Sequence, residues 1–215
     1  AAAAGNWGGI IARHLSTLSV DSALITFAGG TTSVPGGFGG FNAIELHQAN
    51  GRIANSVIEN NGSGLGGNIA DRDARGTHDA AVIFVRASQP VIVDNIIRNN
   101  VVAQTAVISV DANSLEAVPV QDFGKQTGSN DRKPGALGNL GPLVRGNRLL
   151  ANGLSGMRIR GGTLTTESVW DDADIVHVLQ SEVIVPDFHT FGGLRIQSRV
   201  DESLVVKLGA GAGLT

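Results

Sequence analysis

The chain has 215 residues with a net charge of -3 and a pI of about 5.9, and it carries no basic patch, which argues against nucleic acid as a partner. Cysteine is absent, so disulfides and thiolate metal sites are excluded, and no apolar stretch is long enough to span a bilayer. Hydrophobic residues make up 42% of the chain and charged residues only 16%, while glycine occurs 30 times. This composition indicates one repetitive β domain with many tight turns and an aliphatic core.

The two ends of the sequence show none of the polar caps that a stacked repeat protein needs. The chain opens on Ala1-Ala2-Ala3-Ala4 and closes on a run of Gly and Ala from Gly209 to Thr215. We therefore expect residues 1–215 to be a window from a longer chain. Neighbouring domains of that chain would then be its first partners.

Two segments near the beginning of the chain predict strands. The first runs from Trp7 to Ile11, and the second from Val20 to Phe27 places Val20, Leu24 and Phe27 toward a core. The segment from Ala28 to Gly40 is rich in Gly, Thr and Pro, which predicts a loop.

The middle of the chain contains the same short unit more than once: an apolar strand, a turn, a second strand and an Asn. The first copy spans Ala43 to Asn61, the second spans Ala81 to Asn100, and a third appears from Val144 to Asn152. In a weaker copy from Val20 to Ile25, Ser22 takes the Asn position. Aligning the copies gives two Asn positions five residues apart, at Asn55, Asn95 and Asn147 and at Asn60, Asn100 and Asn152.

Repetition of a strand–turn–strand unit indicates a solenoid, because one unit cannot bury its apolar face unless the next unit covers it. The β-branched residues and the lack of a helix pattern predict an all-β fold, a parallel β-helix of about six to eight coils. Successive strands would lie about 4.8 Å apart, so aligned Asn side chains would form a hydrogen-bonded ladder at a corner. The predicted role of these asparagines is structural.

Two long loops interrupt the predicted coils. The loop from Asn61 to Asp79 carries a mixed-charge cluster, and a second loop runs from about Asn113 to Gly141. Such a cluster is either a surface ion-pair set worth little free energy or a substrate-binding surface. Its members are Asp71, Arg72, Asp73, Arg75, His78 and Asp79.

Short strands follow closely on one another in the last third of the chain, and no helix is predicted. The predicted strands are Met157 to Arg160, Ile175 to Leu179, Glu182 to Val185, Gly193 to Ser198 and Ser203 to Leu208.

The Asn-bearing units resemble the right-handed parallel β-helix repeats of the pectate-lyase-like superfamily. The later segments Gly162 to Leu179, Val185 to Arg195 and Glu202 to Leu208 resemble a block found in very large secreted or surface proteins of environmental bacteria. Gly5 to Ile10 and Leu143 to Leu149 are similar to other parts of that block. The resemblance covers most of the chain. It implies a right-handed β-helix in an extracellular or cell-surface parent, and it implies no established chemistry.

An acidic turn is the candidate metal site. Asp171, Asp172 and Asp174 lie close together, with Asp187 further on, and carboxylate oxygens are the ligands that Ca²⁺ prefers. The nearby His177 and His189 would suit a borderline metal instead. The alternative is a solvated turn in which one Asp caps backbone N–H groups.

An enzyme acting on polysaccharides is the second functional hypothesis. Asp171 and Asp172 would serve as carboxylates, and Arg158 or Arg160 as the base of a lyase. The polygalacturonase motifs do not occur in the required order, and few aromatic residues are available to stack on sugars.

The sequence therefore favours a structural or adhesive segment of a large extracellular bacterial protein. Exposed strand edges at the two ends would allow end-to-end assembly into a filament or homo-oligomer. The alternative is a carbohydrate-active domain, a lyase, hydrolase or epimerase, with a polysaccharide as its partner. No cofactor other than Ca²⁺ is expected.

Overall fold

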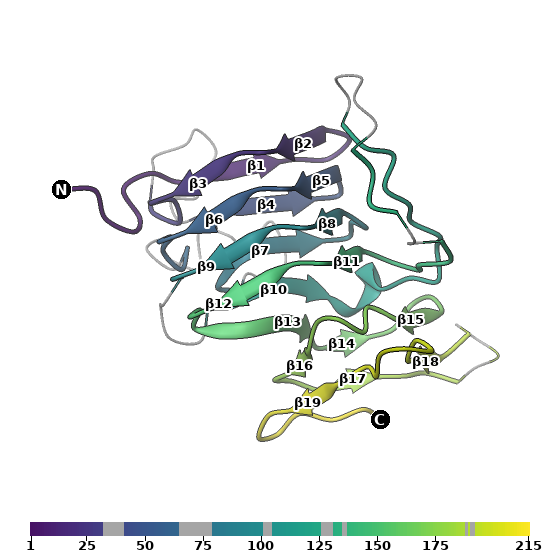
Figure 1. The fold of residues 1–215 in the computed structure, drawn as a ribbon. Coiled ribbons are helices and arrows are strands. Elements are labelled where there is room, and N and C mark those ends of the chain that lie inside the picture. The colour runs from purple at the N-terminus through teal and green to yellow at the C-terminus, as the bar shows by residue number, and fades with distance from the viewer. Residues whose placement is uncertain are drawn as a thin grey trace.

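The structure is a computed structural model, and it describes residues 1–31, 41–64, 79–100, 105–125, 131–134, 137–187, 189 and 192–215. The fold is all-β, and the nineteen strands of the described residues lie in stacked parallel sheets, as predicted (Figure 1). This arrangement is compatible with a β-solenoid, in which each layer of strands covers the one before it. Among the described residues no helix has the length and apolar character needed to cross a membrane.

Sheet A is the longest sheet and has seven parallel strands in the order β1-β4-β7-β10-β13-β16-β19. Its strands are β1 (Ile10–Ala12), β4 (Ile44–His47), β7 (Ala81–Arg86), β10 (Ala106–Asp111), β13 (Leu154–Arg160), β16 (His177–Leu179) and β19 (Val206–Leu208). A 3-10 turn, Ala112–Ser114, follows β10.

Sheets B and C each have four parallel strands. Sheet B contains β2 (Thr17–Asp21), β5 (Asn50–Ala54), β8 (Val91–Val93) and β11 (Leu143–Arg145). Sheet C contains β3 (Leu24–Thr26), β6 (Val57–Glu59), β9 (Ile96–Arg98) and β12 (Arg148–Leu150). Two parallel pairs complete the set, β14 (Gly162–Thr163) with β17 (Val183–Ile184) and β15 (Ser168–Trp170) with β18 (Leu194–Ile196).

The same register links all three sheets in the central repeat. Ile44 pairs with Ile83 in sheet A, Ile53 with Ile92 in sheet B, and Ile58 with Ile97 in sheet C. All six side chains are fully buried and belong to one hydrophobic cluster. Aliphatic side chains therefore stack on their equivalents in the next layer, which buries the apolar face that one layer alone would expose.

Single residues with positive φ turn the chain from one sheet to the next. The φ angles lie between 46° and 70° at Leu15, Gln48 and Ala87 between sheets A and B, at Ser22, Asn55, Asp94 and Gly146 between sheets B and C, and at Phe27, Asn60, Asn99 and Ala151 after sheet C. This left-handed conformation is least costly for Gly and Asn, which explains part of the Asn-rich pattern.

Two of the early predictions need correction. The segment Val20 to Phe27, predicted as one strand, contains parts of two, because Ser22 bends the chain between β2 and β3. The first strand begins at Ile10 rather than at Trp7, whose indole Nε1 donates to the Thr26 carbonyl at 2.8 Å.

Candidate functional site

A ladder of polar side chains joins the layers at the corner between sheets B and C. The Oδ1 atom of Asn95 accepts the backbone N–H of Ser56 at 3.0 Å. Its Nδ2 donates to the Asn147 Oδ1 and to the Ile53 carbonyl, both at 2.9 Å. Asn147 also accepts the backbone N–H of Asn95 at 3.1 Å. Each side chain thus satisfies backbone groups of the layer before it.

A second ladder follows sheet C. Asn61 and Asn100 are buried, and Asn100 Oδ1 accepts both the backbone N–H of Asn61 at 2.9 Å and its Nδ2 at 3.1 Å. Asn100 Nδ2 in turn donates to Asn152 Oδ1 at 3.0 Å and to the Ile58 carbonyl at 3.1 Å. The Ala28 N–H donates to Asn61 Oδ1 at 2.9 Å, which extends the ladder into the first layer.

The predicted ladder is displaced by one residue in its first copy. Asn55 and Asn60 are the positive-φ residues, and the ladder positions belong to Ser56 and Asn61. The side chain of Asn55 instead donates to the Asp21 carboxylate at 3.2 Å. The sequence contains one indication of the correct register, the pair Gly146 and Asn147. Glycine suits the bend but has no side chain for a ladder, so the ladder residue must be the one that follows the bend.

Serines form a third ladder between sheets A and B, which the sequence analysis did not predict. The Ala49 N–H donates to Ser88 Oγ, and the Ser88 N–H donates to Ser114 Oγ, both at 3.1 Å. Ser and Asn occupy equivalent positions because both present an acceptor oxygen close to the backbone.

The acidic turn caps the edge of sheet B. Asp172 Oδ1 accepts the N–H of Val144 at 3.0 Å, and Asp174 Oδ2 accepts the N–H of Gly146 at 2.6 Å. The N–H of Leu143 points the other way, to the Pro90 carbonyl of the preceding layer. Since β11 is the last strand of sheet B, the two carboxylates bind the backbone donors that a further strand would otherwise pair.

The remaining predicted metal ligands also bind backbone donors. Asp171 Oδ2 accepts the N–H of Leu140 at 3.0 Å, and Asp187 Oδ1 accepts the N–H of His189 at 2.8 Å. In the part of the chain that the structure describes, no three His, Cys, Asp or Glu side chains form a group suited to a metal ion. The structure does not bring the four carboxylates together around one point.

Burial sets the protonation of this region. Complete burial raises the pKa of Asp172 well above its ordinary value, although the Val144 N–H opposes the rise. Burial also raises the pKa of Asp171, against the Leu140 N–H and the charge of Arg145. His177 stacks on Trp170 with ring centroids 5.8 Å apart, and burial lowers the pKa of His177 to about 4. In all three groups burial shifts the pKa in the direction that favours the neutral form.

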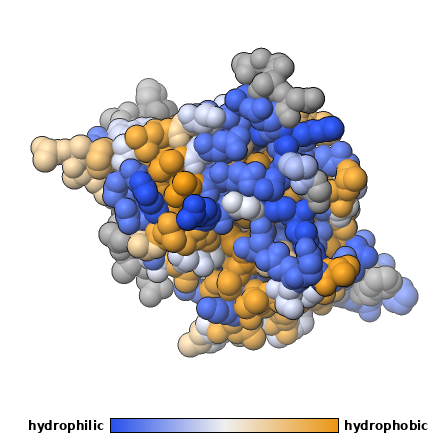
Figure 2. Space-filling view, viewed as in Figure 1, coloured by the Kyte–Doolittle hydropathy of each residue, from blue (hydrophilic) through white to orange (hydrophobic). Residues whose placement is uncertain are grey.

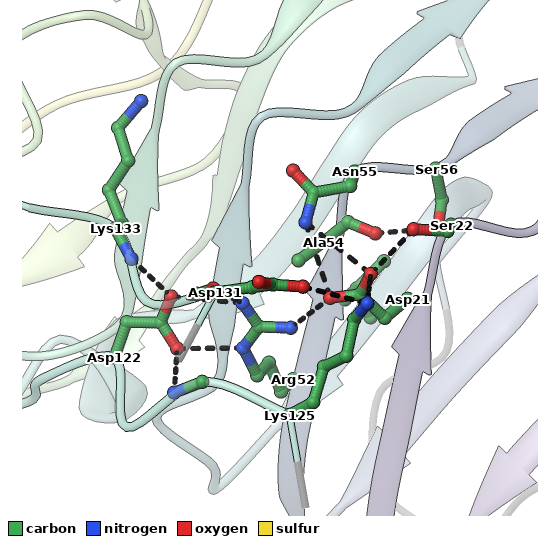
Figure 3. Close-up of polar contacts among 12 residues, drawn as sticks. Asp21, Ser22, Arg52, Ala54, Asn55, Ser56, Asp122, Lys125, Asp131 and Lys133 are labelled. Atoms are coloured by element: carbon green, nitrogen blue, oxygen red, sulfur yellow. Dashed lines mark hydrogen bonds and ion pairs between the residues drawn. The ribbon is translucent and has the colours of Figure 1, made fainter. Parts of the chain in front are cut away.

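A buried ion-pair network fixes the long loop after β10 to the outer face of sheet B (Figure 3). Arg52, on β5, binds Asp122 of the loop through Nε at 2.7 Å and through Nη2 at 3.1 Å. Its Nη1 contacts the carboxylate of Asp21, and its Nη2 donates to the carbonyl of Asp131 at 2.6 Å. We call Arg52, Asp122, Asp21 and Asp131 the loop clamp. One guanidinium thus connects the neighbouring strands β2 and β5 with two points of the loop, Asp122 and Asp131.

Two lysines add to the loop clamp. Lys125 Nζ lies 2.7 Å from Asp131 Oδ2, and Lys133 Nζ contacts the Asp94 carboxylate. Burial opposes ionisation of Asp21, but hydrogen bonds from Ser22, Arg52, Asn55 and Lys125 outweigh it and lower its pKa to about 2. Asp122 likewise has a lowered pKa, because the Arg52 guanidinium and two backbone N–H groups overcome its burial. The charges of the clamp are therefore mutually satisfied.

A groove of about 430 Å³ lies beside the clamp, between sheet B and the loop. Its walls include Leu18, Gly51, Val91 and the exposed Phe123. Figure 2 shows that hydrophilic surface dominates the upper right of the view, where this loop crosses the molecule.

The outer face of sheet A carries a second polar cluster. Glu45 and His47 are buried, and His47 Nε2 lies 2.8 Å from Glu45 Oε2. Arg158 Nη1 binds Asp79 Oδ1 at 2.7 Å, and Ser109 Oγ donates to Asp79 Oδ2 at 2.7 Å. We call these residues together with Arg160 and Asp111 the sheet A cluster.

Arg160 is a buried member of the sheet A cluster with several partners. It donates to Ser109 Oγ at 2.9 Å and to the Val85 carbonyl at 2.6 Å, and its guanidinium carbon lies 4.2 Å from the centroid of Phe84. Burial lowers the pKa of Arg160 to about 10, although Asp111 and Asp79 favour its charged form.

The arginines assigned to the enzyme hypothesis therefore have different partners from those predicted. The structure places Arg158 and Arg160 with Asp79 and Asp111 on sheet A, while Asp171 and Asp172 cap sheet B. Of the mixed-charge loop cluster, Asp79 is described. Asp71, Arg72, Asp73, Arg75 and His78 lie outside the described residues.

No family model, no curated protein and no solved structure matches the chain. The function is therefore argued from the geometry of the described residues.

Proposed function

We propose that this chain is a structural and adhesive segment of a large extracellular bacterial protein, and that it folds as a right-handed parallel β-helix of about seven coils. The seven strands of sheet A support the coil number, with one strand in each coil. The extracellular setting rests on the resemblance of its later segments to large secreted bacterial proteins.

The observation that carries the proposal is that the repeated polar residues bind one layer to the next. Asn95, Asn100 and Ser88 bind backbone groups of neighbouring layers rather than converging on a ligand. The carboxylates of the acidic turn satisfy backbone donors in the same way. Hydrogen bonding of polar side chains between layers is expected of a stiff scaffold, because each layer is stabilised only through its neighbours.

The last layer supports pairing with a further coil or a second copy. Ile196 and Leu208 continue the rows of the buried Trp170 and Leu179, yet Leu208 is 60% exposed. Figure 2 shows hydrophobic surface at the lower end of the view, where β18 and β19 lie. An open strand edge beside exposed apolar side chains is a template for parallel pairing.

The experiment compares assembly of the wild type with that of the double variant Ile196→Lys, Leu208→Lys. Sedimentation and electron microscopy over a concentration series are expected to show end-to-end association of the wild type and its loss in the variant. Phe123→Lys, which changes an exposed apolar residue on the side wall, is the matched control and should assemble normally. Monodisperse wild-type monomers at every concentration would refute end pairing.

The sheet A cluster favours a carbohydrate-active domain as the second candidate function. It places the carboxylates of Glu45, Asp79 and Asp111 on one face with Arg158 and Arg160, the residue types that a polysaccharide lyase or hydrolase uses. The burial of Glu45 and Arg160 favours the structural function instead, because a polymer must reach the reacting groups.

Incubation with neutral and uronic-acid polysaccharides distinguishes the two functions. An enzyme would release new reducing ends or unsaturated products, and Arg160→Lys would abolish that release while the protein stays folded. No turnover of any polysaccharide would leave the structural function alone. Turnover that survives Arg160→Lys would remove the sheet A cluster from the explanation.

A further inference from the structure

Sheet C ends at β12, although sheet A continues with β13, β16 and β19. The next turn of the chain is too short to add a strand there. It begins at Asp174, whose carboxylate binds the Gly146 N–H, and it reaches sheet A at His177, which pairs with Met157. The passage from Gly146 to Met157 takes 11 residues and contains β12, whereas the passage from Asp174 to His177 takes 3. Three residues span at most about 11 Å, so the second passage is direct and leaves the lower edge of β12 uncovered.

This edge carries backbone groups that have no strand partner. Figure 1 shows β12 as the lowest strand of the row β3, β6, β9 and β12. The Arg148 N–H donates to the Asn95 carbonyl at 2.8 Å, so Arg148 bonds upward to β9. The Leu150 carbonyl accepts the Asn99 N–H at 3.1 Å, so Leu150 bonds upward as well. Leu149 lies between them and directs its N–H and C=O downward, because successive residues of a strand alternate in direction. No strand of the described residues pairs with that side.

The two asparagine ladders also end at this edge. Asn147 Oδ1 accepts the N–H of Asn95 at 3.1 Å, and Asn152 Oδ1 accepts the N–H of Asn100 at 3.3 Å. The N–H groups of Asn147 and Asn152 are the next donors in the two ladders, and the described part of the chain offers them no acceptor. An incoming strand with Asn or Ser at two positions five residues apart would supply both acceptors.

The side chains of β12 restrict the rest of the incoming strand. Leu149 is partly buried against the core, and a hollow of about 10 Å³ beside it is also lined by Ile175. An aliphatic residue over Leu149 would therefore continue the core row. Arg148 and Leu150 are exposed and point outward. Residues that lie opposite each other on one face of a sheet interact, so an acidic residue suits the position beside Arg148 and an aliphatic one the position beside Leu150.

We propose that the free edge of β12 binds an extended segment of a partner protein by parallel strand addition. The segment has Asn or Ser at its first and sixth positions, an acidic residue at the second and aliphatic residues at the third and fourth. Its fifth position matches the bend at Ala151, where φ is 49°, and suits Asn. The pairing of β9 with β12 supplies the register for the bound segment. The site lies apart from the end strands β18 and β19, so it does not depend on end-to-end assembly.

The test is an NMR titration of the protein with the blocked hexapeptide Asn-Glu-Ile-Val-Asn-Asn. Shifts should concentrate on the amides of Asn147, Leu149 and Asn152, with a Kd of about 1 mM because one added strand forms few bonds. N-methylation of the second peptide residue removes the N–H that corresponds to that of Arg148, and it should weaken binding at least about tenfold. N-methylation of the third residue alters an N–H that faces solvent in the bound peptide. That matched peptide should keep its affinity within about twofold.

Charge reversal tests the register. Arg148→Glu, at an exposed position, should weaken binding of this peptide about threefold and favour a peptide with Lys at the second position. Lys207→Glu, an exposed position on β19, is the matched control and should change neither affinity. The proposal is overturned if the peptide shifts no amides of β12, if both N-methylated peptides bind equally well, or if Arg148→Glu leaves the preference unchanged. Shifts at β12 that depend on protein concentration alone would assign the edge to a second copy and would overturn it as well.

Discussion

Asparagine has two different roles at the corners of this fold. One residue takes the positive φ of the bend, and the residue after it forms the ladder hydrogen bonds. Asn99 bends the chain with a φ of 55°, and the next residue, Asn100, uses its amide to bind the layers on either side. The bend depends on backbone conformation, whereas the ladder depends on buried hydrogen bonds. Substitutions at adjacent positions should therefore differ greatly in cost.

Asn100→Ala is expected to be severely destabilising. It removes the partners of the Asn61 N–H, the Ile58 carbonyl and the Asn152 side chain. A buried polar group left without a partner costs about 1–3 kcal/mol, so we expect a loss of about 3 kcal/mol or more in the free energy of unfolding. The control Asn99→Gly keeps the bend and should change stability by less than about 1 kcal/mol. Urea unfolding measures both, and equal losses would contradict the assignment of tasks.

The buried Asp172 should make stability depend on pH. Burial raises the pKa of Asp172 in the folded state above its unfolded value of about 3.9, so the folded state binds the proton more tightly. The stabilising contribution of this group is complete below the unfolded pKa and is lost as the pH rises through the folded pKa. Asp172→Asn keeps an acceptor for the Val144 N–H without the ionisation.

The free energy of unfolding of Asp172→Asn should accordingly exceed that of the wild type at neutral pH, and the gap should close as the pH falls to about 4. Thermal unfolding of both proteins across this pH range measures the gap. The lowered pKa of His177 has the opposite effect on stability, but both proteins contain His177, so its effect cancels in the difference. A gap that stays constant with pH would show that Asp172 does not titrate on unfolding.

At the scale of elements, the loop clamp explains how the described parts of the long loop after β10 are held on sheet B. Arg52→Leu leaves the carboxylates of Asp122 and Asp21 buried without their main partner. Breaking a buried ion pair in this way costs about 3–5 kcal/mol, and the loop should become open to cleavage by trypsin after Lys125. Limited proteolysis and urea unfolding measure the two effects.

The exposed pair of Arg98 and Glu59 on sheet C is the matched control. Their side chains are 45% and 18% exposed and lie 2.6 Å apart across neighbouring strands. Arg98→Leu should cost less than about 1 kcal/mol, because solvent screens the pair, and it should leave the loop resistant. Similar losses for the two arginines would mean that the clamp adds nothing beyond a surface contact.

Strands that belong to the repeated apolar pattern could be predicted from the sequence. The ladder register, the capping of sheet B and the loop clamp could not, because they depend on residues far apart in the chain. Parallel strands followed from the recurring apolar runs, whereas the choice between Asn55 and Ser56 as the ladder residue depends on φ. Nothing in the residues around Asp171 shows that sheet B ends at β11, so capping remained one of two interpretations. The clamp joins Arg52 to Asp122, 70 residues apart, and no local pattern links them.

At the scale of the whole molecule, the equal spacing of the second and third layers in all three sheets makes one complete layer removable. Equivalent residues of the second and third layers lie 39 residues apart, as in the bonds from Ser56 to Asn95 and from Asn61 to Asn100. The same spacing holds in sheets A, B and C. Solenoid stability is approximately a sum over layers and their interfaces, so loss of one layer lowers stability without destroying the fold.

Deleting residues 61–99 removes β7, β8 and β9 and joins Asn60 directly to Asn100. The positive-φ bend is then still followed by a ladder asparagine, and β4, β5 and β6 meet β10, β11 and β12 in the native register. We expect this variant to unfold cooperatively at a lower urea concentration than the wild type, with an unchanged β-type circular dichroism spectrum. Deleting residues 61–98 places Asn99 after Asn60 instead and shifts the following strands by one residue. Because a shift of one residue turns the core face of a strand toward solvent, that variant should fail to fold. If the two deletions behave alike, the layers are not the interchangeable units that this register implies.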